Sequence, residues 1–196
     1  YGDFGPFTLW LGAILFAFQI YGDFSGYTDI AIGSAKLLGF DLMTNFKTPY
    51  FSRDIAEFWR RWHISFSTWF RDYLYFPLGG SRKGLWRSII NTIIILVVSG
   101  FWNGANWKYI FWGALNAVYF IPLLLLNRNR KNLDEADVKY FPTIRGLVGI
   151  GITFFFTCIA WVFFRAENIG DAFEFVGRMF YFHEGKNLFI GKNLLI

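Results

Sequence analysis

The sequence predicts an all-α membrane protein, a polytopic bundle of about four to six transmembrane helices. Composition leads to this class first, because 55% of the 196 residues are hydrophobic, only 17% are charged, and Phe alone occurs 26 times. A soluble domain of this size seldom has so apolar a composition. Four charge-free stretches then reach the roughly 20 residues that a helix needs to cross a bilayer core.

The expected spans, in chain order, are 4–22, 88–107, 109–126 and 146–164. The shorter stretch 30–40 contains Lys36, and it either continues the first helix or forms a partly buried helix of its own. Five polar residues precede it, namely Gln19, Asp23, Ser25, Thr28 and Asp29. Charge at membrane depth is costly, so this group indicates either a polar site inside the membrane or a helix break at its surface.

Residues 53–75 are expected to form an amphipathic or re-entrant helix. Aromatic residues recur there at spacings of three and four, interleaved with Arg60, Arg61, His63 and Arg71. One interpretation is a helix lying in the membrane interface, where Trp, Tyr and Arg are favoured. The other is a helix that dips into the membrane to line a cavity, with its arginines binding an anionic ligand.

The distribution of Lys and Arg predicts the orientation. Residues 36–87 contain nine of them against four acids, and residues 128–145 contain five against three, whereas residues 165–192 contain four against four. The first two segments, with Ser81 and Asn132, are therefore expected in the cytoplasm. The chain would then rise through 88–107, turn near Gly104 and return, which places the polar stretch VSGFWNGANW deep in the membrane or on its far side. This bias also accounts for the net charge of +5, so no nucleic acid is expected as a partner.

Residues 1–196 are interpreted as a single membrane-embedded region of a longer protein. The chain opens on Tyr1 without an initiator Met, and it closes on LFIGKNLLI, which is typical of the start of another span. Chemistry is hard to assign from the residues alone. His63, His183 and Cys158 lack the spacing of zinc ligands, and no Gly-x-Ser-x-Gly motif indicates a serine hydrolase. No metal site is predicted.

Three stretches carry a resemblance to a known family. They are QIYGDFSGYTDIAIG, NFKTPYFSRDIAEFWRRWHISFSTWFRDYLYFPLGGSRKG and VSGFWNGANWKYIFWGALNAVYF, and together they run from about Gln19 to Phe120. The chain resembles the membrane-bound O-acyltransferase (MBOAT) superfamily, and within it the alginate O-acetyltransferase branch, with the D-alanyl lipoteichoic acid transferase as a cousin.

The resemblance implies a helix bundle around a tunnel, in the bacterial inner membrane. Through it, an acetyl or other short acyl group would pass from a cytoplasmic thioester donor, acetyl-CoA or an acyl-carrier protein, to a hydroxyl of an exported polysaccharide or cell-wall glycan. The donor is a co-substrate, and no tightly bound cofactor is expected. Membrane lipid and periplasmic or extracellular acetylation proteins are the other expected partners. Arg60, Arg61, Arg71, Trp102 and Asn106 are the expected substrate-binding residues.

The resemblance also assigns the expected catalytic positions. His63, in the WRRWHIS motif, corresponds to a family His on the cytoplasmic side, whereas a second His, in a Trp-His-Gly-Ala motif, is the family's presumed base. Here that motif reads Trp102, Asn103, Gly104, Ala105. An imidazole accepts a hydroxyl proton near neutrality and a carboxamide does not, so the departure bears on turnover.

Three accounts of Asn103 remain open. It is an engineered or copying substitution, the mark of a natural pseudoenzyme, or a sign that another group is the base. The enzyme hypothesis therefore stands beside a second one, a catalytically silent scaffold or acyl-donor binder in a glycan modification complex. A transporter would suit broken helices but does not suit the motifs.

Overall fold

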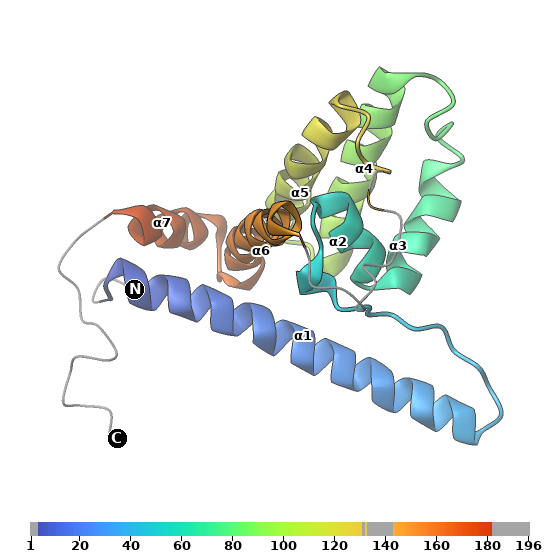
Figure 1. The fold of residues 1–196 in the computed structure, drawn as a ribbon, viewed down its shortest axis with the longest axis horizontal. Helices are drawn as coiled ribbons and strands as arrows, with labels where there is room; N and C mark the ends of the chain where they lie inside the picture. The colour runs from blue at the N-terminus through green and yellow to red at the C-terminus, as the bar shows by residue number, and fades with distance from the viewer. Residues whose placement is uncertain (1–3, 131, 133–142, 182–196) are drawn as a thin grey trace.

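The computed structural model describes residues 4–130, 132 and 143–181, and the regular elements within these ranges are helices joined by loops. The elements are α1 (Pro6–Leu37), the short helix η1 (Pro49–Phe51), α2 (Ile55–Arg61), α3 (Ile64–Phe70), the π-helical turn η2 (Arg71–Tyr75), α4 (Leu85–Asn103), α5 (Trp107–Leu125), α6 (Ile144–Arg165) and α7 (Ile169–Phe180) (Figure 1). The predicted all-α class is confirmed. His183 and the expected further span at 188–196 lie outside the described residues.

Four helices are long and apolar enough to cross a membrane, namely α1, α4, α5 and α6. Each contains most of one charge-free stretch, which confirms that these stretches are helical, and α1 extends well beyond the first of them. The amphipathic helix α7 packs against α1 and α6. Figure 1 shows α6 and α7 over the first half of α1, whose second half extends well past them.

Helix α1 is a single helix of 32 residues, about 48 Å long at 1.5 Å per residue. The stretch 30–40 therefore continues the first helix, and the alternative of a helix break among the polar residues is wrong. The physical reason is that these side chains leave the backbone ladder intact: the Thr28 hydroxyl donates to the Phe24 carbonyl within the helix at 2.9 Å. The helix ends at Leu37 and is followed by Gly39, whose φ of 84° a residue with a side chain rarely adopts.

Helices α4 and α5 form the predicted hairpin, with the reversal at residues 104–106. They approach closely because glycines lie at their contact. A Cβ on Gly100 would collide with the Tyr109 carbonyl oxygen, and one on Gly113 would collide with the Leu96 carbonyl oxygen. Small residues let membrane helices pack backbone to backbone in this way.

The segment 53–75 is not one helix, which corrects the sequence-based expectation. Asp54 starts α2, where its side chain accepts a hydrogen bond from the Glu57 amide at 2.7 Å. The helix then stops, and His63 takes a left-handed conformation with φ 43° and ψ 61°. The amides that follow the break bind Asn45: Ile64 donates to its backbone oxygen and Ser65 to its side-chain oxygen, both at 3.0 Å. These partners replace the bonds that a continuous helix would have made.

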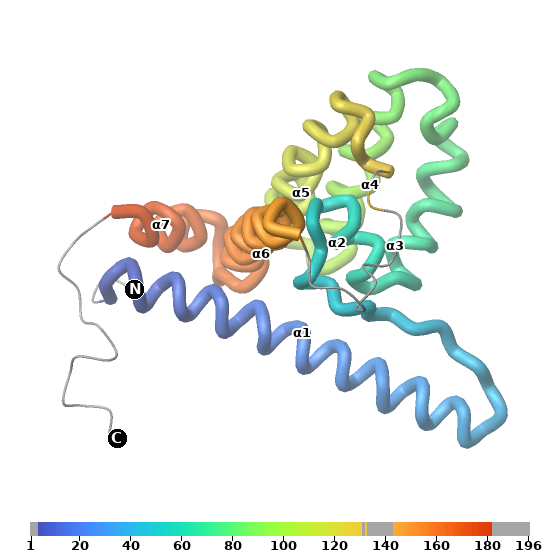
Figure 2. Tube along the Cα trace, viewed as in Figure 1, coloured from blue at the N-terminus to red at the C-terminus, as the bar shows by residue number. Residues whose placement is uncertain are grey.

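The broken segment lies between α1 and the hairpin of α4 and α5 in the trace of Figure 2, and an aromatic core holds it there. The ring of Trp62 lies 5.0 Å from that of Trp161 in α6, and Trp161 stacks on Trp112 of α5 at 5.9 Å. All three rings are almost fully buried. Tyr21 of α1 contacts Trp62 from the other side at 6.2 Å. Residues 55–62 are thus packed inside the helix bundle, whereas Trp69 and Arg71 to Tyr73 are exposed.

Candidate active site

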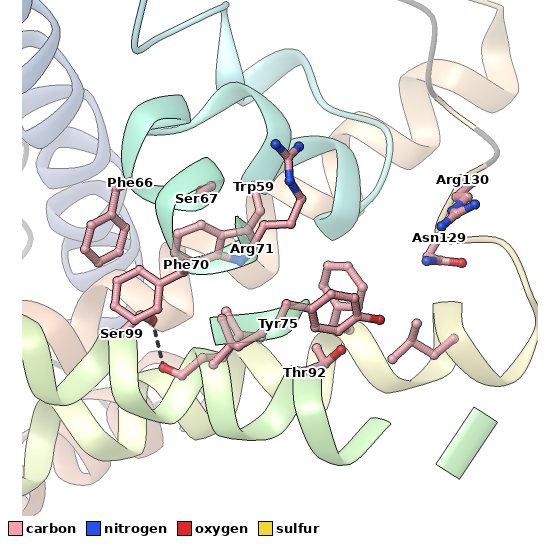
Figure 3. A pocket seen from close by; sticks show the side chains of 14 residues that line it. Trp59, Phe66, Ser67, Phe70, Arg71, Tyr75, Thr92, Ser99, Asn129 and Arg130 are labelled. Carbon is pink, nitrogen blue, oxygen red and sulfur yellow. Dashed lines mark hydrogen bonds between the residues drawn. The ribbon is translucent and has the colours of Figure 1, made fainter. Parts of the chain in front are cut away.

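A cavity of about 250 Å³ lies between the segment 59–75 and the hairpin of α4 and α5. Its wall is mainly apolar, with several aromatic rings, and two arginines from different segments also line it (Figure 3). The lining includes Trp59, Phe66, Phe70, Tyr75, Thr92, Ser99, Arg71 and Arg130. Figure 3 places Phe66 and Ser99 at one end and Asn129 and Arg130 at the other. The cavity is therefore elongated, apolar along its walls and cationic towards one end.

The floor of the cavity is one face of α4. Thr92, Leu96 and Ser99 line it, and their spacing of four and three residues puts them on one side of the helix. Asn103 continues the same face one turn farther on, about 6 Å along the axis. Helical geometry thus aligns Asn103, the position at which the sequence resemblance predicts a base, with the cavity floor.

Asn103 is the last residue of α4, and its side chain is fixed. Its amide Nδ2 donates to the backbone oxygen of Ser99 at 2.8 Å. The side chain is exposed within the described part of the chain. Its Oδ1 remains available to accept a hydrogen bond, but a carboxamide does not take up a proton near neutrality.

The other two predicted residues of the 98–107 stretch, Trp102 and Asn106, lie near the end of α4 and the start of α5. Asn106 caps α5 by accepting a hydrogen bond from the Lys108 amide at 3.1 Å. Trp102 is 70% exposed, and its ring lies 6.3 Å from that of Trp69 in α3. The polar residues of VSGFWNGANW therefore serve, first, to end one helix and begin the next. The Trp pair joins this turn to the segment that roofs the cavity.

The three predicted arginines have different surroundings. Arg71 lines the cavity and also pairs with Asp72, Nε to Oδ1 at 2.8 Å, a hydrogen bond that lowers the pKa of that exposed carboxyl. Arg60 donates to the backbone oxygens of Asn129 at 3.0 Å and Asn132 at 2.7 Å. It thereby holds the segment after α5 that carries Arg130. Arg60 thus supports the cavity from outside, whereas Arg71 faces it.

Arg61 is 8% exposed and belongs to a buried ion cluster. Its Nη2 lies 2.7 Å from Oε1 of Glu57, and Nε of Arg53 lies 3.0 Å from Oε2 of the same carboxylate. Glu57 itself is 1% exposed. The structure therefore uses the charge of Arg61 inside the protein and away from the cavity.

His63 lies among aromatic rings at the break between α2 and α3. Its ring stacks on Phe66 at 4.9 Å and meets the edge of Phe24 at 4.7 Å. Burial lowers the pKa of this imidazole. Through Phe66 the residue touches the cavity wall, but it does not line the cavity itself.

Of the predicted site residues only Arg71 lines the cavity, and the polar lining residues that sequence reasoning missed include Thr92, Ser99 and Arg130. Counting back from Asn103 in steps of four, three and four would have found Ser99 and Thr92. No sequence signal places Arg130 there, because its position depends on how the segment after α5 folds back. Within the described ranges, no group of three His, Cys, Asp or Glu side chains could hold a metal ion.

Comparison with known proteins adds a family to this geometry. Residues 4–169 match the model of MBOAT, the membrane-bound O-acyltransferase family. Over 173 residues the chain is 45% identical to a probable alginate O-acetylase of Pseudomonas putida, which covers 88% of this chain and 34% of the relative.

Two further relatives are enzymes named for other polymers. A peptidoglycan O-acetyltransferase of Helicobacter pylori is 39% identical over 165 residues, covering 84% of this chain and 30% of the relative. A teichoic acid D-alanyltransferase of Bacillus subtilis is 30% identical over 168 residues, covering 80% of this chain and 42% of the relative. The chain spans about a third of the length of the alginate O-acetylases that it matches.

Proposed function

The chain belongs to the membrane-bound O-acyltransferase family, and we propose that it transfers an acetyl or other short acyl group from a cytoplasmic thioester donor to a hydroxyl of an exported polysaccharide or cell-wall glycan. One observation carries the proposal: an elongated cavity leads along one face of α4 from Arg71 and Arg130 towards Asn103, the family's base position. The relatives support the substrate class, since they are named for alginate, peptidoglycan and teichoic acid.

The reaction requires a nucleophile, a proton acceptor and a leaving thiol. The acceptor hydroxyl oxygen attacks the thioester carbonyl, its proton passes to a base, and the carbon–sulfur bond breaks. Asn103 can orient the hydroxyl through Oδ1, because Nδ2 is held by the Ser99 carbonyl. Asn103 cannot take up the proton. The rate of acyl transfer by this chain is therefore expected to be about 10² to 10⁴ times lower than that of a form with a base at this position.

The second candidate function is a silent scaffold or acyl-donor binder in the same glycan modification system, with acetylation proteins outside the membrane as partners. The carboxamide at position 103 favours it. The two functions differ in one measurable quantity, ester-linked acetate on the exported glycan, measured in cells that lack their own acetyltransferase and express the protein from its complete gene.

Removing the two cavity arginines is expected to weaken donor binding. Arg71→Gln with Arg130→Gln should raise the Kd for acetyl-CoA by at least about tenfold, because each guanidinium offers charge-assisted hydrogen bonds to an anionic donor. The measurement is calorimetric titration of the purified protein in detergent. Arg82→Gln with Lys83→Gln removes the same charge from exposed positions outside the cavity lining and should change Kd less than about twofold. An equal loss of acetyl-CoA affinity in both variants would show that the cavity is not the donor-binding site.

The proposed location is the bacterial inner membrane, with residue 81 on the cytoplasmic side and residue 105 on the other. Both residues are exposed and lie in the turns at opposite ends of α4, a helix about 28 Å long. In intact cells, a membrane-impermeant thiol reagent should label Ala105→Cys but should label Ser81→Cys only after the membrane is opened. The native Cys158 is buried and gives little background. Labelling of Ser81→Cys from outside would reverse the orientation.

A further inference from the structure

A second cavity, of about 440 Å³, opens where α2 and α6 begin and α5 ends. Three arginines from these three places line it, Arg53, Arg128 and Arg145, together with Asp54. It is separate from the cavity on α4, with which it shares no lining residue. Its lining carries a net positive charge, and nothing in the proposed transfer reaction uses it.

The single acid in this cavity is already engaged. One oxygen of Asp54 accepts the Glu57 amide at 2.7 Å, and the other accepts Nδ2 of Asn132 at 2.6 Å. Arg53 is bound to Glu57. Arg128 and Arg145 are exposed, and neither forms an ion pair with any residue that the structure describes. Their charge is therefore available to a ligand within the described ranges.

The start of α6 adds backbone donors to the same cavity. Thr143, Arg145 and Gly146 line it, and Thr143 caps the helix by accepting the Gly146 amide at 3.3 Å. The first amides of a helix have no partner within it and favour a negative charge. Together with the arginines they form a pocket suited to the oxygens of a phosphate group.

Beside this pocket the surface is apolar. Ile144 is 82% exposed, and Leu147 and Val148, on the next turn of the same membrane-crossing helix, are 54% and 56% exposed. The end of a span is the level at which phospholipid headgroups lie. We infer that the pocket binds the phosphate of an anionic phospholipid, with the acyl chains lying along the first turns of α6. A soluble phosphate shares the headgroup chemistry but would leave the apolar side chains uncovered.

The test uses the purified full-length protein in vesicles or nanodiscs of stated composition. Native mass spectrometry should detect retained phosphatidylglycerol, and the protein should bind it at least about tenfold more tightly than phosphatidylcholine. Arg128→Gln with Arg145→Gln should lose at least about tenfold of that affinity. The matched control, Arg82→Gln with Lys83→Gln, should lose less than about threefold, because it removes equal charge from the surface outside the pocket. Size-exclusion profiles and circular dichroism verify that both variants are folded.

Three further results discriminate. Inorganic phosphate that displaces phosphatidylglycerol at micromolar concentration would overturn the lipid as occupant, whereas displacement only above about 10 mM supports it. Equal losses in the pocket variant and the control would overturn the site, since general surface charge would then suffice. The stretch 133–142, outside the described residues, contains Asp134, Glu135 and Asp137. If lipid binds only after these are changed to Asn and Gln, the arginines are neutralised within the chain and the inference fails.

Discussion

Replacing Glu57 by Gln is expected to lower the free energy of unfolding by about 3–5 kcal/mol, the cost of removing one partner from a buried ion cluster. Gln keeps the shape of Glu but not its charge. The Glu57 carboxylate accepts Arg61 Nη2 at 2.7 Å, and Arg53 Nε and backbone amide at 3.0 and 2.8 Å. With the carboxylate gone, the Arg61 guanidinium, whose side chain is 10% exposed, stays buried without a counter-charge.

The measurement is the apparent melting temperature of the purified protein in detergent. The matched control is Glu174→Gln, which removes an ion pair of the same i, i+4 spacing to Arg178 at 2.9 Å. That carboxylate is 55% exposed, so its loss should cost less than about 1 kcal/mol. A Glu57→Gln protein that melts at the temperature of the control would mean that the cluster is not needed for stability. That result would also mean that Arg61 is not required for stability, in agreement with the substrate-binding role predicted from the sequence.

The parts of the fold that follow from local sequence were predictable. Four spans could be identified because each is a charge-free apolar stretch of bilayer length. Within the polar stretch, α4 ends at Asn103 and α5 begins after Asn106. A hydrophobic span and the residues that start or end a helix can both be recognised from neighbouring residues in the sequence. The spacing from Glu57 to Arg61 was also local, and it could have identified the ion pair that now accounts for Arg61.

The parts that depend on distant partners were not predictable. The break at His63 is stabilised by Asn45, whose carbonyl binds the Ile64 amide. No sequence pattern within residues 53–75 indicates that Asn45 would be the hydrogen-bond partner. Arg130 lines the cavity from a segment whose backbone is bound by Arg60, a residue about 70 positions away in the sequence. Long-range packing overrides local periodicity in such places, and here those places form the walls of the candidate site.

Replacing Asn103 by His is expected to raise acetylation of the exported glycan by at least about tenfold, the conservative end of what a positioned base contributes. The structure gives a specific reason. The Asn103 amide nitrogen is attached to Cγ and donates to the Ser99 carbonyl at 2.8 Å. In a His side chain, Nδ1 has the same attachment to Cγ, so Nδ1–H can donate to the same carbonyl. That hydrogen bond selects the tautomer in which Nε2 is unprotonated and free to accept the hydroxyl proton.

The measurement is ester-linked acetate on the glycan, in cells lacking their own acetyltransferase, with the protein expressed from its complete gene and equal insertion verified by immunoblot. Asn103→Gln is the matched control, since it changes side-chain length but offers no base, and its acetylation should stay at the level of the Asn form.

Equal, substantial acetylation by the Asn and His forms would show that residue 103 is not the base and would direct attention to His63, which contacts the cavity wall through Phe66. No acetylation by either form, with donor and partner proteins supplied, would favour the scaffold. A gain with His but not with Gln would instead show that the remaining site is shaped for acyl transfer and lacks only its proton acceptor.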